Sequence, residues 1–154
     1  MKMTILFILS VASLHVFAQQ DNATRKRNLN NENFIALRHF DPVSYFKNKP
    51  QKGTEKIQYD FKGITYYFVS QENLEAFKKT PEKYEPMFGG WCAYTLATKG
   101  ERVRIDPTAY KIIDGKLFLF YNFSGENRMK KWEETKDQKT LKLNAAKGWA
   151  KTMH

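Results

Sequence analysis

The chain has 154 residues, a formal net charge of +10 and a single cysteine, Cys92. A chain of this length forms one domain around one core. One cysteine excludes an intramolecular disulfide, and the twelve Phe, eight Tyr and three Trp supply enough apolar area for a core without one. Basic residues are spread along the chain, a pattern that favours general solubility over a nucleic-acid surface.

Residues 1–18 have the pattern of a secretory signal peptide. Lys2 supplies the positive start, an apolar stretch runs to Val16, and Ala18 is the small residue before the expected cleavage site. The stretch is too short for a transmembrane helix, and no later segment is long and apolar enough. We therefore expect a soluble exported protein, periplasmic or extracellular, without a transmembrane segment after cleavage.

The next segment, residues 19–33, is polar and has no apolar period. This composition predicts a disordered leader, followed by one domain over residues 34–152. Asp41 and Pro42 are typical of a helix start, because Asp caps free backbone N–H groups and Pro has none at the first helical position.

Two β-hairpins are predicted from alternation and turn residues. Residues 57–61 and 64–69 flank the turn Lys62-Gly63. Residues 110–113 and 116–120 flank Asp114-Gly115, a pair suited to the positive φ angles of a type I′ turn.

Helical spacing and capping residues predict the remaining elements. Ser70 caps one helix, Pro81 starts a short second one, Ser124 caps a third, and a last helix begins near Gln138. Short antiparallel hairpins with helices packed on them define a small single-domain α+β fold.

Several segments carry a specific order of aromatic, proline and glycine residues. They are residues 40–46, 59–68, 77, 81–84, 89–93 and 114–117. In this order they resemble the exported YHS domain-containing proteins, and the resemblance extends from about residue 35 to residue 149. It implies a small α+β domain, distantly related to TRASH-type modules proposed to bind copper or zinc.

The chain departs from that pattern at two places. The cysteine-bearing relatives have thiolates at positions that correspond to Val69 and Asn73, so their usual metal site is not carried over. Related exported proteins also often have Gly before the Tyr-Asp-Pro sequence, where this chain has His39 before Phe40.

Cys92 is the central candidate for chemistry. A thiol near a helix start has a lowered pKa, which suits a soft metal such as copper, and His39 and Met87 are the donors that we assign to the same site. The open alternative is that Cys92 fills a tight apolar space beside Gly89-Gly90, because free cysteines are among the most buried residues.

Two other functions stay open. The aromatic runs Tyr66-Tyr67-Phe68 and Phe118-Leu119-Phe120-Tyr121 either line a pocket for an apolar ligand or, more simply, form the two faces of sheet strands. Cys92, His39 and Asp41 supply a nucleophile, base and orienting acid if they meet in space, although a helix cap explains Asp41 more simply.

The sequence thus favours a non-enzymatic exported YHS-domain protein that binds or handles a metal ion, copper first, through Cys92, His39 and Met87. Metal-handling proteins are then its expected partners, and nucleic acid is not. The alternative is a binding module for a non-metal small ligand or a protein partner, with Cys92 structural. A thiol-dependent enzyme is the third candidate.

Overall fold

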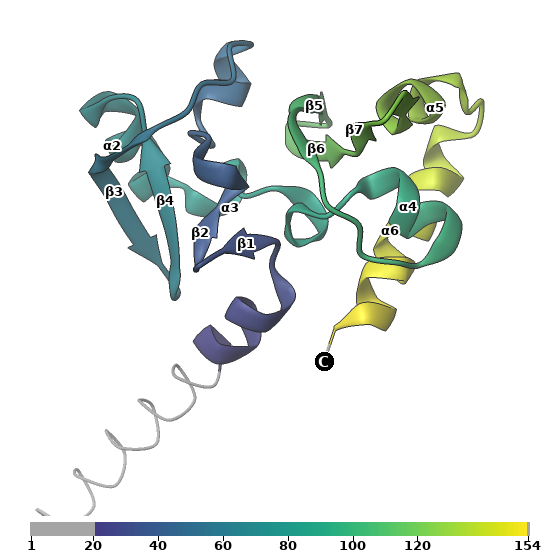
Figure 1. Ribbon diagram of the computed structural model, residues 1–154, viewed down its shortest axis with the longest axis horizontal. Coiled ribbons are helices and arrows are strands. Elements are labelled where there is room, and N and C mark those ends of the chain that lie inside the picture. Colours follow the sequence, from purple (N-terminus) through teal and green to yellow (C-terminus); the bar gives the residue numbers. More distant parts are fainter. Residues whose placement is uncertain (1–20, 154) are drawn as a thin grey trace, which may run out of the picture.

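Two lobes lie side by side in the computed structural model of this protein, which describes residues 21–153 (Figure 1). We call residues 21–86 the N-terminal lobe and residues 87–153 the C-terminal lobe. The predicted signal peptide, residues 1–18, lies outside the described residues. No helix among residues 21–153 is long and apolar enough to cross a membrane.

The N-terminal lobe is a small mixed sheet covered by short helices. Its elements are β1 (Asn31–Glu32), β2 (Ile35–Ala36), η1 (Leu37–His39), η2 (Ser44–Lys47), β3 (Thr54–Phe61), β4 (Ile64–Phe68), α2 (Gln71–Lys79) and α3 (Pro81–Tyr84). The strand order is β1-β2-β4-β3, with β2 parallel to β4 and the other pairs antiparallel. The hairpin predicted around Lys62-Gly63 is confirmed, and Ser70 caps α2 as predicted.

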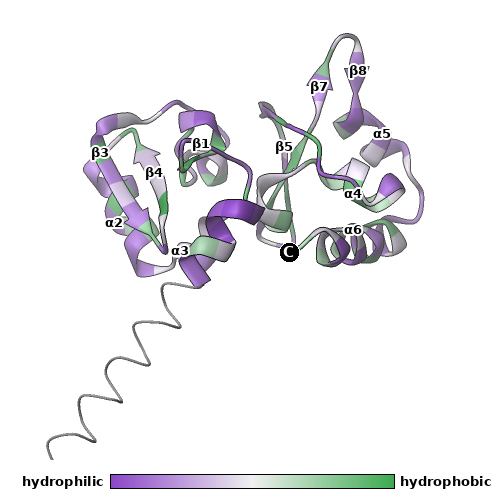
Figure 2. Cartoon of the chain, turned by 60° about the horizontal axis from the view of Figure 1, so that its bottom comes forward, coloured by the Kyte–Doolittle hydropathy of each residue, from purple (hydrophilic) through white to green (hydrophobic). Residues whose placement is uncertain are grey.

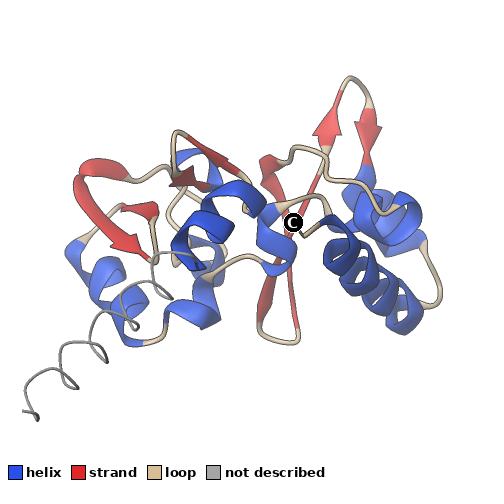
Figure 3. Ribbon diagram, turned by 90° about the horizontal axis from the view of Figure 1, so that it is seen from below, coloured by secondary structure: helices blue, strands red, loops and turns tan. Residues whose placement is uncertain are grey.

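The C-terminal lobe packs helices against a second hairpin. Its elements are η3 (Met87–Gly90), α4 (Ala93–Lys99), β5 (Asp106–Ile113), β6 (Lys116–Phe120), β7 (Asn122–Phe123), β8 (Glu126–Asn127), α5 (Arg128–Glu134) and α6 (Gln138–Thr152). The hairpin at Asp114-Gly115 is confirmed. The cap predicted at Ser124 is wrong: Asn127 caps α5, because Ser124 and Gly125 instead form the turn between β7 and β8. Helices and short antiparallel pairs together make the α+β fold that the sequence predicts (Figure 3).

Two aromatic clusters form the core. In the N-terminal lobe the Phe77 ring lies within 6.4 Å of five other rings, those of Tyr59, Phe61, Tyr66, Phe68 and Tyr84. In the C-terminal lobe the Trp132 ring packs against Phe118 and Phe120. The first cluster continues into the C-terminal lobe through Cys92, Ile105 and Leu117, which joins the lobes into one folded unit.

The close approach of α4 and α6 depends on one glycine. A Cβ at Gly148 would lie 2.2 Å from the backbone oxygen of Leu96. Only glycine leaves room for that oxygen, so Gly148 sets the spacing of the two helices.

Residues 21–33 differ from the disordered leader that the composition predicts for residues 19–33. Residues 21–28 are helical, and β1 extends the sheet (Figure 1). Figure 2 shows this helix as mostly hydrophilic, in agreement with the polar sequence. Buried polar contacts hold it in place instead of an apolar stripe: Asn28 is 2% exposed and hydrogen-bonds to the C-terminal lobe.

The η1 turn carries three consecutive non-glycine residues in the left-handed region. The φ angles are 56° at Leu37, 51° at Arg38 and 72° at His39. Each such residue costs about 1–2 kcal/mol, because Cβ crowds the following carbonyl. Two hydrogen bonds hold the turn, from Phe40 N to Leu37 O and from Gly53 N to His39 O.

Candidate functional site

Cys92 lies inside the core. It is the residue before α4, its side chain is fully buried, and the backbone N–H of Tyr121 donates to its sulfur at 3.3 Å. The Arg128 guanidinium is close by: Glu126 is the main group that raises the pKa of Arg128, and the Cys92 sulfur adds to the effect. The sulfur is therefore already a hydrogen-bond acceptor, shielded from solvent by its neighbours.

His39 and Met87 lie in other places. The His39 ring stacks on the Tyr67 ring, with 5.4 Å between their centroids, at a shallow surface depression beside Lys52. Met87 begins η3 and lines a cavity between the lobes that neither Cys92 nor His39 lines. No hydrogen bond or ring contact among the described residues joins any two of these three.

Asp41 occupies the place where the resemblance puts a metal site. Its Oδ2 accepts hydrogen bonds from the backbone N–H of Val69 at 3.0 Å and from Nδ2 of Asn73 at 2.6 Å. These two residues correspond to the missing thiolates. Oδ1 accepts from the backbone N–H groups of Val43 and Ser44, so Asp41 caps the turn that leads into η2, although the helix begins later than predicted, at Ser44.

The described residues do not fit a metal site as they are packed. No group of three His, Cys, Asp or Glu side chains within residues 21–153 is arranged to hold a metal ion. Both oxygens of the fully buried Asp41 carboxylate already accept protein hydrogen bonds, and the Cys92 sulfur already accepts one from the backbone N–H of Tyr121. The side chains of His39 and Asp41 also form no hydrogen bond with each other. The catalytic arrangement of Cys92, His39 and Asp41 therefore lacks the contact between base and orienting acid.

A cavity of about 410 Å³ lies between the lobes and beneath the helix of residues 21–28. Its apolar wall comes from both lobes and includes Leu29, Ile64, Phe88, Trp149 and Met153. The end of α6, which carries Trp149 and is followed by Met153, lies next to residues 21–28 (Figures 1 and 3). The volume is in the range of small-ligand sites, which are concave and mostly apolar with a few polar groups.

The polar groups of this cavity include a hydrogen-bonded corner. The hydroxyl of Tyr66 donates to Oε1 of Glu85 at 2.5 Å, and Arg25 donates to the same oxygen at 2.6 Å. Burial and the Glu85 charge together raise the pKa of Tyr66, so this hydroxyl stays protonated. Burial opposes the charge of Arg25, but Glu85 outweighs it and the pKa of Arg25 is raised.

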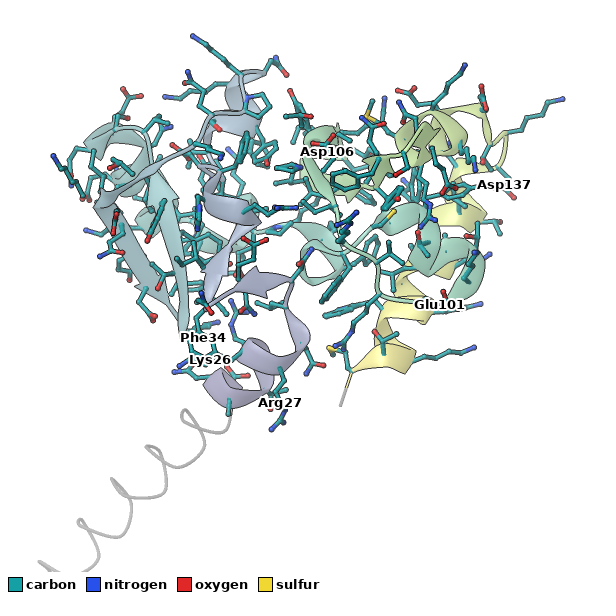
Figure 4. The ribbon with its side chains drawn as sticks, in the orientation of Figure 1. Lys26, Arg27, Phe34, Glu101, Asp106 and Asp137 are labelled. Carbon is teal, nitrogen blue, oxygen red and sulfur yellow. The ribbon has the colours of Figure 1, made fainter. Side chains whose placement is uncertain are left out.

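Arg25 is held firmly in that corner. Its Nε donates to the backbone oxygen of Lys62, and its guanidinium carbon lies 5.6 Å from the centre of the Phe61 ring. The two other basic residues of this segment are placed differently. Lys26 lies over the Phe34 ring at 4.7 Å, and Arg27 is exposed; both are labelled with Phe34 in Figure 4.

The helix of residues 21–28 forms the roof of the cavity, and Asn28 attaches this roof to the C-terminal lobe. Its backbone oxygen accepts from Nε1 of Trp91 at 2.7 Å, and its Oδ1 accepts from Arg102 at 2.5 Å. The guanidinium of Arg102 in turn lies near the Trp91 and Trp149 rings, at 5.9 and 5.1 Å from their centres. The roof is thus part of the folded structure.

Sequence reasoning found only one side of this cavity. The aromatic run that contains Tyr66 was one of the two pocket predictions, and Met87 lines the cavity without the metal role assigned to it. Arg25 and Glu85 were missed, because they are 60 residues apart and neither carries a local pattern.

The comparison with protein families matches the N-terminal lobe. A family model for the YHS domain matches residues 41–87, so this chain contains a YHS domain and the predicted resemblance is confirmed for that segment. The match leaves out residues 21–40 of the N-terminal lobe and ends at Met87, the first residue of the C-terminal lobe. No curated protein and no solved structure gives a significant match.

Proposed function

We propose that this YHS-domain protein is a binding protein for a small, largely apolar molecule, which it holds in the cavity between its lobes. The carrying observation is the combination of a cavity of about 410 Å³ with the ordered polar corner of Tyr66, Glu85 and Arg25. Sites of this kind gain affinity from the apolar wall and orientation from a few fixed polar groups. Preorganised donors and acceptors cost little entropy on binding.

The YHS segment supplies part of the site. Ile64, Tyr66 and Glu85 lie within residues 41–87, whereas the roof and the far wall lie outside them. In this proposal the YHS domain is the scaffold of a ligand site, and Cys92 has a structural role in the junction of the lobes.

The test is a titration with prodan, a neutral naphthalene dye whose fluorescence rises in apolar surroundings. We expect saturable binding to the purified protein. Thr24→Phe, which places a ring into the cavity from its roof, is expected to weaken this binding at least tenfold. Thr98→Phe is the matched control, because Thr98 is an exposed helical threonine outside the cavity. Absence of saturable binding, or equal binding by the two variants, would contradict the proposal.

Copper binding through Cys92 is a second candidate, favoured by the YHS match alone. Since the sulfur is fully buried, a metal would have to open the core to reach it. A Cu(I) titration of the protein and of Cys92→Ala distinguishes the candidates. We expect equal affinity in both; a loss of affinity in Cys92→Ala would favour the metal candidate instead.

We also propose export as the setting of this function, on the basis of the signal-peptide pattern in residues 1–18. Amino-terminal sequencing of the protein recovered from the periplasm or medium is expected to start at Gln19. Recovery of an uncleaved chain from the cytoplasm would contradict this proposal.

A further inference from the structure

The charges that line the cavity are opposite in balance to those of the whole chain. The chain carries 26 Lys and Arg against 16 Asp and Glu. The described residues that line the cavity include three carboxylates, Asp21, Glu82 and Glu85, and one cation, Arg25. The cavity is therefore a locally acidic site within a basic protein.

Arg25, the one cation among the described lining residues, is already bound to other protein groups. Arg25 binds Glu85 at 2.6 Å and donates to the backbone oxygen of Lys62. Because its charge offsets that of Glu85, and Glu82 pairs with Lys62 at 3.9 Å, the lining retains the charge of Asp21. A carboxylate ligand would have to compete with Glu85 for Arg25 and would meet the charge of Asp21. The lining thus disfavours an organic anion.

Glu85 keeps one acceptor for a ligand. Both of its protein hydrogen bonds go to Oε1, from Tyr66 and from Arg25. Oε2 accepts no hydrogen bond from any described residue, although the Glu85 side chain is only 17% exposed. A carboxylate on such a largely buried side chain is well suited to a charged N–H donor, because such bonds are strong and gain from the low local dielectric.

The rest of the lining sets the body of the ligand. All described lining residues from the C-terminal lobe are apolar or glycine: Met87, Phe88, Gly89, Trp149 and Met153. A ligand that places a polar head at Glu85 therefore lays an apolar body against this wall. Aromatic faces such as those of Phe88 and Trp149 also attract cations and disfavour anions.

We infer that the ligand of this cavity is an organic amine, with its ammonium group at Oε2 of Glu85 and its apolar body against the wall of the C-terminal lobe. This inference rests on the proposed function and names the ligand class for the same site. Such a ligand has a single positive charge next to one or two aromatic rings, or next to an alkyl body of similar volume.

Three probes of nearly equal shape and different charge test the inference. They are 1-naphthylmethylamine (positive), 1-naphthylmethanol (neutral) and 1-naphthoate (negative), each titrated by calorimetry against the purified protein. We expect the amine to bind at least tenfold more tightly than the alcohol, and naphthoate to bind most weakly. An alcohol or naphthoate that binds as tightly as the amine would overturn the inference and leave the proposed function standing. Binding of none of the three would overturn both.

Two variants assign the preference to named groups. Glu85→Gln is expected to lower the preference for the amine over the alcohol at least fivefold, with alcohol affinity nearly unchanged. Asp21→Asn leaves the polar corner intact and is expected to lower the preference about twofold. Glu133→Gln is the control, because Glu133 is a carboxylate on α5 paired with Lys111 and does not line the cavity. An unchanged preference in both Glu85→Gln and Asp21→Asn would overturn the inference.

Discussion

The two lobes contribute different things to the same cavity. All of the described polar and charged residues in its lining come from the N-terminal lobe, whereas the C-terminal lobe supplies only apolar residues and one glycine. The N-terminal lobe contains the segment that matches the YHS family, and the C-terminal lobe is unmatched. The difference indicates that the YHS half and its leading helix determine which ligand chemistry is recognised, while the second half determines the shape of the ligand.

The lobes also differ in how they are stabilised. The N-terminal lobe is built around one ring, that of Phe77, which contacts five others. The C-terminal lobe depends on a close helix pair and the Trp132 ring. Substitutions at these places therefore act on different parts of one folded unit, with the cavity between them.

The largest effect is expected for Phe77→Ala in the N-terminal lobe. Removal of a fully buried ring from the centre of a cluster costs about 3–5 kcal/mol of unfolding free energy. Urea unfolding followed by tryptophan fluorescence measures it. Leu143→Ala, at a 54% exposed position of α6, is the control and is expected to change stability by less than about 0.5 kcal/mol. A cost for Phe77→Ala below that of the control would refute the central role of this ring.

The second largest loss of stability is expected for Gly148→Ala, in the C-terminal lobe. The added Cβ would lie 2.2 Å from the Leu96 oxygen, so α6 has to move away from α4. We expect a loss of about 1–3 kcal/mol, together with weaker prodan binding because Trp149 on the same helix moves. Lys147→Ala, an exposed neighbour in α6, should leave both unchanged. Normal prodan binding in a destabilised Gly148→Ala protein would show that the wall of the cavity is independent of this helix spacing.

Asn28→Ala tests the link between the lobes. It removes the Oδ1 acceptor of Arg102, whose Nε is already buried without a hydrogen-bond partner in the described part of the chain. We expect a cost of about 1–3 kcal/mol and faster hydrogen exchange in residues 21–28. Asn30→Ala is the comparison variant and is expected to have a smaller effect, because the Asn30 side chain donates one hydrogen bond, to the backbone oxygen of Gly90. Unchanged exchange in residues 21–28 would mean that Asn28 does not hold the roof.

The smallest effect, and the one with the opposite sign, is expected for His39→Gly. Glycine removes the cost of a left-handed backbone at φ 72°, about 1–2 kcal/mol, but loses more entropy on folding and gives up the stacking on Tyr67. The net result should be a gain of up to about 1 kcal/mol in chemical unfolding. Lys52→Gly nearby, outside the left-handed region, should be destabilising. A clear loss of stability in His39→Gly would show that the ring contact outweighs the backbone cost.

Local features of the sequence predicted the parts of the fold that depend on local contacts. Lys62-Gly63 and Asp114-Gly115 adopt positive φ angles in the two predicted hairpins, because these turns require it regardless of distant residues. Ser70 caps α2 for the same reason. The His39 position, where the resemblance leads to the expectation of glycine, is left-handed, a backbone conformation that glycine adopts without strain.

The features that sequence reasoning missed depend on residues far apart in the chain. The order of residues 21–28 comes from Asn28, which bonds with Trp91 and Arg102 more than 60 residues away. The cavity and its polar corner likewise join Arg25, Tyr66 and Glu85 from separate segments. No period or motif encodes such contacts. The metal assignment to Cys92, His39 and Met87 stays a prediction from the donor types of these side chains.

The burial of Cys92 has a practical consequence for experiments on this protein. Its thiol is the only one in the chain and sits where the core of the N-terminal lobe meets the C-terminal lobe. A thiol reagent such as Ellman's reagent can react with it only during moments when that junction opens. The rate of the colour change in the native protein therefore measures how often this junction opens. A ligand bound in the cavity is expected to lower that rate, so the same reaction measures ligand binding without an introduced label.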